Sequence, residues 1–274
     1  MSNTETVIIY KKSFVAYLDV LGFQSMVRGN EEIKINQYFR IVNETITALK
    51  KIKSKAKIGS IIISDSIILT VCVDTNDIEE KKYLLRQLCI AVKTIQYQLA
   101  LYDVWLRGAV TYGNVFFNED MNQIVGPAYM DAYLLEEKIA LYPRVILDSK
   151  LVKDLYCETA SEFINMLNNH DFYGNIGSEK DRNILFSWIK LDNFETTIIN
   201  QDIPLFINYL IPDKYDDLKE FNTIINIIRE NLYKNITFYK KYRWLADYLL
   251  SITYIQTIYG SPYSNKIVNL LRQL

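Results

Sequence analysis

The sequence is poor in the residues that most often mark a catalytic or metal site. It contains a single histidine, His170, and only three cysteines, Cys72, Cys89 and Cys157. One histidine excludes zinc sites built from several histidines. Three widely spaced cysteines form neither a disulfide framework nor a zinc knuckle, and they indicate reduced thiols. Any metal ion must therefore be held by carboxylates, which favours magnesium or manganese.

An excess of one charge and long apolar runs are also missing. The chain has 31 basic and 32 acidic side chains, so it lacks the positive field on which nucleic-acid binding relies. No apolar run approaches the length of a membrane span, and residues 1–12 lack the order of a signal peptide. Glycine and proline are scarce, and half of the residues are hydrophobic, as in a folded domain. We expect a soluble, cytoplasmic protein that binds neither membranes nor nucleic acid.

Hydrophobic periodicity predicts alternating strands and helices over the first part of the chain. The expected order is strand 14–18, helix 31–50, hairpin 58–73, helix 78–102, hairpin 104–117, helix 125–141 and strand 143–147. The second hairpin is inferred from a Gly113-Asn114 turn between apolar runs. This order is typical of an α/β (α+β) fold of the ferredoxin-like type, with a mixed or antiparallel sheet and helices on one face.

A mostly helical extension, residues 151–274, is predicted to pack on a catalytic domain formed by residues 1–150. Helices are expected at 151–167, 216–233, 236–259 and 266–271, a strand at 184–191 and a polar loop at 168–182. No Gly-, Pro- or Ser-rich linker divides the two parts, which favours packing over a separate interaction domain. The run FYKKYRW at 238–244 can bind single-stranded nucleic acid, but it is more typical of a helix with one packed and one solvated face.

The stretch 13–26, SFVAYLDVLGFQSM, joins an apolar strand to a helix through a carboxylate and a glycine. Asp19 interrupts the apolar run, and a charge at the end of a buried strand needs a partner. A divalent cation is one such partner, and capping of the next helix is the other interpretation. Gly22 permits a tight turn, after which helix amides point toward a bound anion. The stretch predicts a metal carboxylate beside a small phosphate-binding turn.

Two more charged residues interrupt predicted strands. Asp65 lies between two β-branched runs, and Arg107 lies within the apolar run LRGAV. Adjacent strands would place Asp19 and Asp65 at one sheet edge, where two carboxylates repel each other unless cations lie between them. Paired metal ions activate an attacking oxygen and stabilise a leaving one, and arginine binds phosphate oxygens in a bidentate manner. The alternative interpretation of the set is a buried Asp–Arg salt bridge.

Four segments together resemble the catalytic domain of class III nucleotide cyclases: FVAYLDVLGF, the ISDSI hairpin, LRGAVTYG and IVGPAYMDAYLLEEKIALYPRVILDS. Within that family the sequence is most similar to the pyrimidine nucleotide cyclases of bacterial Pycsar anti-phage systems. The resemblance implies conversion of UTP to 3′,5′-cyclic UMP and pyrophosphate as a second messenger, with CTP and cyclic CMP as the alternative. It also implies two Mn²⁺ or Mg²⁺ ions and a homodimer with two composite sites.

The same resemblance implies roles for individual residues. Asp19 and Asp65 match the two metal-binding aspartates of the family, and Arg107 matches an arginine that contacts the triphosphate. The turn whose amides bind the β- and γ-phosphates corresponds to three residues: Gly22, Phe23 and Gln24.

The sequence departs from the family pattern at two places. An asparagine and an arginine that stabilise the transition state in the family are replaced by Met130 and Leu134. Three residues are available as substitutes, with no choice among them: Tyr129, Tyr133 and Arg144. The lysine that recognises a purine is replaced by Ile61, which argues against an adenylate cyclase and is compatible with a pyrimidine.

Two other functions remain open from the sequence. A palm-type nucleotidyltransferase, which makes a cyclic oligonucleotide, shares the paired carboxylates and a similar sheet. A degenerate cyclase-like module would bind a nucleotide or a partner without chemistry.

Overall fold

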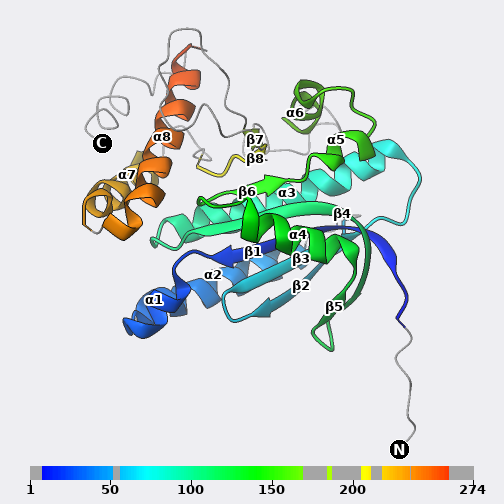
Figure 1. Ribbon diagram of the computed structural model, residues 1–274, viewed down its shortest axis with the longest axis horizontal. Helices are drawn as coiled ribbons and strands as arrows, with labels where there is room; N and C mark the ends of the chain where they lie inside the picture. Colours follow the sequence, from blue (N-terminus) through cyan, green and yellow to red (C-terminus); the bar gives the residue numbers. More distant parts are fainter. Residues whose placement is uncertain are drawn as a thin grey trace, which may run out of the picture.

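The chain forms one mixed sheet with helices on both faces (Figure 1). The computed structural model describes residues 8–51, 56–168, 184–186, 205–210, 218–234 and 236–258. The strand order is β2-β3-β1-β4-β6-β8-β7, and β5 pairs with β4 outside this path. The strands are β1 (Lys11–Val20), β2 (Ile58–Ile63), β3 (Ser66–Cys72), β4 (Leu106–Asn118), β5 (Gln123–Val125), β6 (Val145–Leu147), β7 (Leu185–Phe186) and β8 (Phe206–Ile207).

The first four strands of the path have the ferredoxin-like order. β1 is antiparallel to both β3 and β4, and β2 is antiparallel to β3, so helices connect β1 to β2 and β3 to β4 as in a split βαβ unit. β4 and β6 are parallel, which makes the sheet mixed and confirms the predicted fold class. The helices are α1 (Phe23–Arg28), α2 (Glu32–Lys51), α3 (Ile78–Ala100), α4 (Pro127–Lys138), α5 (Lys150–Asp154), α6 (Ala160–Asn168), α7 (Leu218–Leu232) and α8 (Ile236–Ile258).

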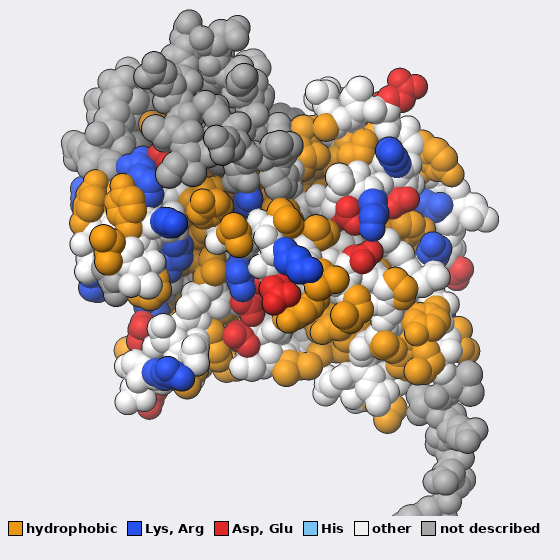
Figure 2. Space-filling model, viewed as in Figure 1, with side chains coloured by type: hydrophobic (Ala, Val, Ile, Leu, Met, Phe, Trp, Pro, Cys, Tyr) orange, Lys and Arg blue, Asp and Glu red, His pale blue; other side chains and the backbone are white. Residues whose placement is uncertain are grey.

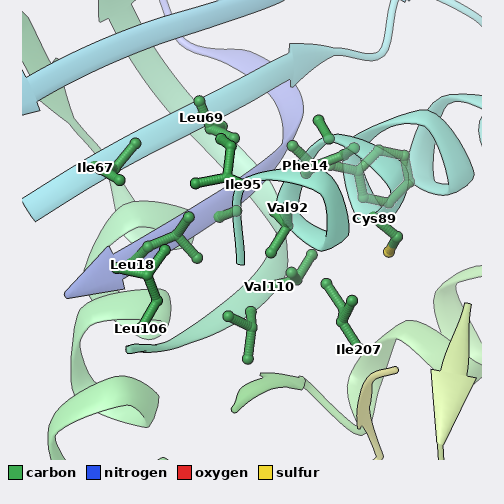
Figure 3. Close-up of a cluster of buried hydrophobic side chains, with 14 of the residues drawn as sticks. Phe14, Leu18, Ile67, Leu69, Cys89, Val92, Ile95, Leu106, Val110 and Ile207 are labelled. Atoms are coloured by element: carbon green, nitrogen blue, oxygen red, sulfur yellow. The ribbon is translucent and has the colours of Figure 1, made fainter. Parts of the chain in front are cut away.

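Alternate residues of β1 face two different layers, because side chains of a strand point to opposite faces in turn. Phe14 and Leu18 pack against α2 and α3 in the larger core, where α3 lies across the strands (Figure 3). Val15 and Tyr17 face the other way, toward Ala128 of α4. The sequence prediction placed the helices on one face, and α4 is the exception. Its buried side carries small alanines, which let the helix lie against the sheet.

The apolar spacing of the sequence also predicts that Ala132, Leu135 and Ile139 form the buried stripe of α4, and the structure agrees only in part. Its buried residues are Ala128, Ala132 and Glu136, whereas Ile139 is exposed. The predicted stripe is thus right at Ala132, which is fully buried, and at Leu135, which is partly buried against the core, and wrong at Ile139. The buried side therefore includes a carboxylate, which becomes important for the site.

The second predicted hairpin turn is wrong. Gly113 and Asn114 continue β4, opposite Ser13 and Lys12 of β1, and the turn lies at 119–122. Long-range pairing with β1 overrides the local turn preference of the Gly-Asn pair. In the same strand, Gly108 permits a close approach to β1, because a Cβ there would lie 2.3 Å from the Tyr17 carbonyl oxygen.

The single helix predicted at 151–167 is two helices. α5 ends at Asp154 and α6 begins at Ala160, and Tyr156 between them has a left-handed backbone with φ of 56°. β8 was not predicted, since a two-residue strand has too little periodicity to detect. Only residues 184–186 of the predicted strand 184–191 are described. The loop 169–182 and the helix 266–271 lie outside the described residues.

The C-terminal part shares the sheet and has its own aromatic core. β8 and β7 extend the sheet beyond β6, and α7 and α8 pack over its end. The Tyr248 hydroxyl donates to Asn208 Oδ1 at 2.6 Å and accepts from the Tyr209 amide at 2.9 Å. The Tyr209 hydroxyl in turn donates to the Pro143 carbonyl oxygen at 2.6 Å. These contacts join the extension to the strands, while a domain boundary at residue 150 stays a prediction.

Three further expectations concern the FYKKYRW run, the cysteines and membrane spans. The FYKKYRW run forms the start of α8, with Tyr242 and Trp244 buried and Lys240 exposed, as expected for a half-packed helix. All three cysteines are free. Within the described residues, each helix is too short or too polar to span a bilayer.

Candidate active site

Strand register brings the three charged residues of the predicted site together. Asp19 lies near the end of β1, opposite Ser66 of β3 and Arg107 of β4. Asp65 occupies the β2–β3 turn, and its carbonyl oxygen accepts from the Val20 amide at 3.1 Å. The structure thus places Asp19 and Asp65 at one sheet edge, as the sequence predicted. Their role as metal ligands stays a prediction.

The turn that carries Asp65 is fixed by two tyrosines. The Tyr38 hydroxyl of α2 donates to the Ser64 carbonyl oxygen at 3.1 Å. The Tyr17 hydroxyl and Ser66 Oγ are hydrogen-bonded at 2.9 Å. Ser64 has a left-handed φ of 56°, which such contacts help to hold. Neither tyrosine was identified from the sequence, because apolar periodicity gives no sign that a core tyrosine reaches a turn carbonyl.

Arg107 lies between two carboxylates. Its Nε is 3.6 Å from Asp19 Oδ2 and 2.6 Å from Glu136 Oε1. The ion pair with Asp19 is the alternative that the sequence left open. Because a guanidinium has five N–H donors, pairing with a carboxylate leaves others for a phosphate.

The carboxylates of this site are held in an unfavourable environment for negative charge. Burial, followed by the charge of Asp65, raises the pKa of Asp19 to about 6, although Arg107 opposes the shift. Burial also raises the pKa of Glu136 to about 7, with the charges of Asp19 and Asp65 adding to it and Arg107 opposing it. Three carboxylates thus face one guanidinium, and an added cation would stabilise the ionised carboxylates.

Glu136 was missed by the sequence analysis. Its side chain is 4% exposed and lies on the face of α4 that covers β1 and β4. A carboxylate four residues after Ala132, on a stripe of small residues, is the signal that could have identified it. The predicted stripe at 132, 135 and 139 does not include position 136, so the sequence analysis did not single out this residue.

The β1–α1 turn presents free backbone amides. Gly22 has a left-handed φ of 83° and precedes α1 without a side-chain cap. Among the described residues, no acceptor is assigned to the amides of Gly22, Phe23 or Gln24, whereas the Gly22 carbonyl accepts from Ser25 and Met26. The Phe23 ring is buried against Tyr38, with centroids 5.8 Å apart, so only its amide faces a ligand. Gln24 is exposed.

The residues that replace family residues, namely Met130, Leu134 and Ile61, lie in different environments. Met130 and Leu134 are exposed on the outer side of α4, at 48% and 37%. Ile61 is 1% exposed and belongs to the core under α4, so its side chain is not available to a base.

Tyr129, Tyr133 and Arg144, the possible replacements for the family's asparagine and arginine, also lie in different environments. Arg144 is buried, with its guanidinium 5.6–5.9 Å from the rings of Tyr142, Phe206 and Trp244. Tyr129 and Tyr133 pack edge-on against Tyr17, which lies two residues before Asp19. The two tyrosines thus contact a residue of β1 beside the site, whereas the Arg144 side chain lies among aromatic rings and only its carbonyl oxygen, which accepts from the Gly108 amide, lies beside Arg107.

The donor set fits Mg²⁺ or Mn²⁺ that is bound together with a phosphate ligand. The described residues contain no group of three or more His, Cys, Asp and Glu side chains arranged for a metal ion. Mg²⁺ typically takes one or two carboxylates together with substrate phosphates and water, rather than a complete protein cage. Asp19 and Asp65 supply two carboxylates, and the adjacent Gly22 turn supplies amides for phosphate oxygens.

Comparison with known proteins finds nucleotide cyclases among the structural neighbours of this chain. No protein-family model and no curated protein sequence matches the chain. The guanylyl cyclase Cya2 is 16% identical, with 54% of this chain and 80% of that chain covered and a TM-score of 0.38. The adenylyl cyclase CyaB from P. aeruginosa is 15% identical over 54% of this chain and 83% of that chain, with a TM-score of 0.39. A bacterial light-regulated adenylyl cyclase is 13% identical over 80% and 99%, also with a TM-score of 0.39. At this level of similarity the neighbours carry no information on substrate or chemistry.

Proposed function

We propose that this chain is a metal-dependent pyrimidine nucleotide cyclase that converts UTP to 3′,5′-cyclic UMP and pyrophosphate. The observation that carries the proposal is that Asp19 and Asp65 lie together at one sheet edge. Three residues after Asp19, the Gly22 turn presents backbone amides that have no assigned acceptor among the described residues. The motif resemblance adds the order of these residues along the chain. CTP, giving cyclic CMP, is the alternative substrate.

In this proposal, one set of groups binds the phosphates of the substrate and another activates its ribose hydroxyl. The amides of Gly22, Phe23 and Gln24 bind the β- and γ-phosphates. Arg107 keeps its pair with Glu136 and directs its remaining donors to the triphosphate. Asp19 and Asp65 would hold two Mg²⁺ or Mn²⁺ ions, which would supply positive charge and lower the pKa of the ribose 3′-hydroxyl.

In the reaction the ribose 3′-oxygen attacks the α-phosphorus and loses its proton. The bond from the α-phosphorus to the bridging oxygen breaks, and pyrophosphate leaves. Fixed geometry and neutralised charge supply most of the acceleration in such phosphoryl transfers. Tyr129 and Tyr133 are our candidates for the contacts that the family makes with asparagine and arginine, because they flank Tyr17 beside the site.

The outer face of α4 is our candidate for the homodimer interface. Met130, Tyr133 and Leu134 expose 48%, 36% and 37% of their surface there, although each is largely apolar. Figure 2 shows hydrophobic side chains gathered over this part of the molecule. A second copy packed on this face would cover them and close the site from the α4 side. A role in anti-phage signalling follows from the resemblance alone and belongs to the same proposal.

The substrate is tested by one experiment. The purified chain is incubated with ATP, GTP, CTP and UTP together and Mn²⁺, and the products are separated and weighed by mass spectrometry. We expect cyclic UMP and an equal amount of pyrophosphate. A cyclic dinucleotide or longer product would identify a nucleotidyltransferase instead. Bound nucleotide without any pyrophosphate would identify a module that has lost the chemistry.

A further inference from the structure

Two adjoining cavities lie between the β1–α1 turn and the start of α8. Their volumes are about 460 and about 310 Å³. Both are lined by Leu21 and Gly22 from the turn and by Phe238 and Lys241 from α8. The turn assigned to the phosphates therefore opens toward the C-terminal extension.

The lining of the larger cavity carries an excess of positive charge. Its charged lining consists of Lys34, Lys234, Lys241, Glu31 and Asp103. Lys34 Nζ pairs with both acids, at 3.0 Å from Glu31 Oε2 and 2.9 Å from Asp103 Oδ2. The lining therefore has one more positive than negative charge, and both acids form their ion pairs with Lys34 rather than with Lys234 or Lys241.

The smaller cavity is lined by Lys240 and Lys241 and by no acidic residue. Lys241 Nζ lies 5.3 Å and 4.4 Å from the ring centroids of Phe238 and Tyr242. These rings hold the ammonium in place without neutralising it. Within the described part of the chain, no carboxylate forms an ion pair with Lys241.

The surroundings of Lys241 favour an anion. Burial lowers the pKa of Lys241 to about 8, and the charge of Lys34 acts in the same direction, whereas Asp103 and Glu31 oppose it. The side chain is therefore mostly protonated at neutral pH, and an anion would stabilise that charge. Thr237 and Phe238, at the start of α8, line the smaller cavity, and the first turn of this helix has no acidic residue. Figure 2 shows Lys and Arg side chains gathered over α7 and α8.

We propose that the C-terminal extension completes an oligophosphate-binding site, in which Lys241 and Lys240 bind the terminal phosphates of the substrate against the Gly22 turn. This inference rests on the proposed function for the identity of the ligand. Both cavities reach Gly22, three residues after Asp19, but neither Asp19 nor Asp65 lines them. A ligand that contacts both the carboxylates and the lysines must therefore extend past the Gly22 turn and carry several negative charges, which describes a triphosphate better than a monophosphate.

The site is tested by titrating the full chain with inorganic tripolyphosphate, UTP and UMP in isothermal calorimetry, in the presence of EDTA. We expect tripolyphosphate and UTP to bind and UMP to bind much more weakly. Lys241→Gln should weaken tripolyphosphate binding by roughly 10- to 100-fold, the effect of one charge-assisted hydrogen bond. Lys240→Gln, on the exposed side of the same cavity, should weaken it by a smaller factor.

Lys219→Gln is the matched control, because it removes the same charge from an exposed position on α7 outside both cavities. Equal affinities for Lys241→Gln and Lys219→Gln would overturn the inference, as would equally tight, Lys241-dependent binding of UMP. Absence of any tripolyphosphate binding would also overturn it. Lys241-dependent tripolyphosphate binding in a chain that forms no cyclic nucleotide would sustain the oligophosphate site and reject the cyclase.

Discussion

Asp65→Asn is expected to lower Mn²⁺-dependent release of pyrophosphate from UTP by at least about 1,000-fold, because the site would lose one of its two metal carboxylates. The substitution keeps the size of the side chain. It also keeps the backbone carbonyl of residue 65, which accepts from Val20 in the β2–β3 turn. The turn should therefore fold as before while its metal affinity falls. The rate is measured in a coupled pyrophosphate assay at saturating UTP.

Asp120→Asn is the control for this change. Asp120 is an exposed aspartate between β4 and β5, in another turn of the same sheet. It should retain activity within about twofold of the wild type, since exposed substitutions away from a site have small effects. Turnover by Asp65→Asn close to that of Asp120→Asn would show that Asp65 is not part of the catalytic machinery.

The second large effect is a loss of stability as pH rises in the metal-free protein. Burial and mutual repulsion raise the pKa of Asp19 from 3.8 to about 6 and that of Glu136 from 4.5 to about 7. Between pH 4 and pH 7 the folded state therefore holds more protons than the unfolded state. Stability falls with rising pH wherever the folded state holds more protons. We expect these two groups together to lower the free energy of unfolding by roughly 5 kcal/mol across this range.

The variant Asp19→Asn isolates the contribution of Asp19 to this pH dependence of stability. Asparagine resembles the protonated acid, so the variant should be more stable than the wild type at pH 7–8 and nearly equal to it at pH 4. Its unfolding free energy is measured by urea denaturation with EDTA across the pH range. Excess Mn²⁺ should stabilise the wild type at neutral pH and leave the variant almost unchanged.

Equal pH profiles for the wild type and Asp19→Asn would show that Asp19 is not destabilised by its surroundings. The variant should also lose nearly all cyclase activity. Loss of activity together with a gain in stability would separate a functional role of Asp19 from a structural one.

Strand register explains why part of the site could be predicted from the sequence. Asp19 and Asp65 stand where charges interrupt or separate apolar β-branched runs, so their position at a sheet edge follows from local pattern. The order of the first four strands follows from the same pattern, because strands and helices alternate as in a split βαβ unit.

Glu136 and Lys241 could not be identified in the same way, because their importance depends on tertiary placement. Glu136 reaches Arg107 only because α4 lies on the face opposite α2 and α3. Lys241 belongs to a cavity whose other wall, Gly22, comes from the opposite end of the chain. The Gly113-Asn114 pair shows the converse, since a strong local turn signal was overruled by pairing of β4 with β1.

The central claim is that Asp19 and Asp65 hold common metal ions. The most direct measurement is a crystal structure with Mn²⁺ and a non-hydrolysable UTP analogue, in which manganese is located by its anomalous scattering. The account predicts manganese coordinated by carboxylate oxygens of both aspartates and by phosphate oxygens of the analogue. Manganese bound elsewhere, or an Asp19–Arg107 pair that persists beside a metal-free Asp65, would contradict it.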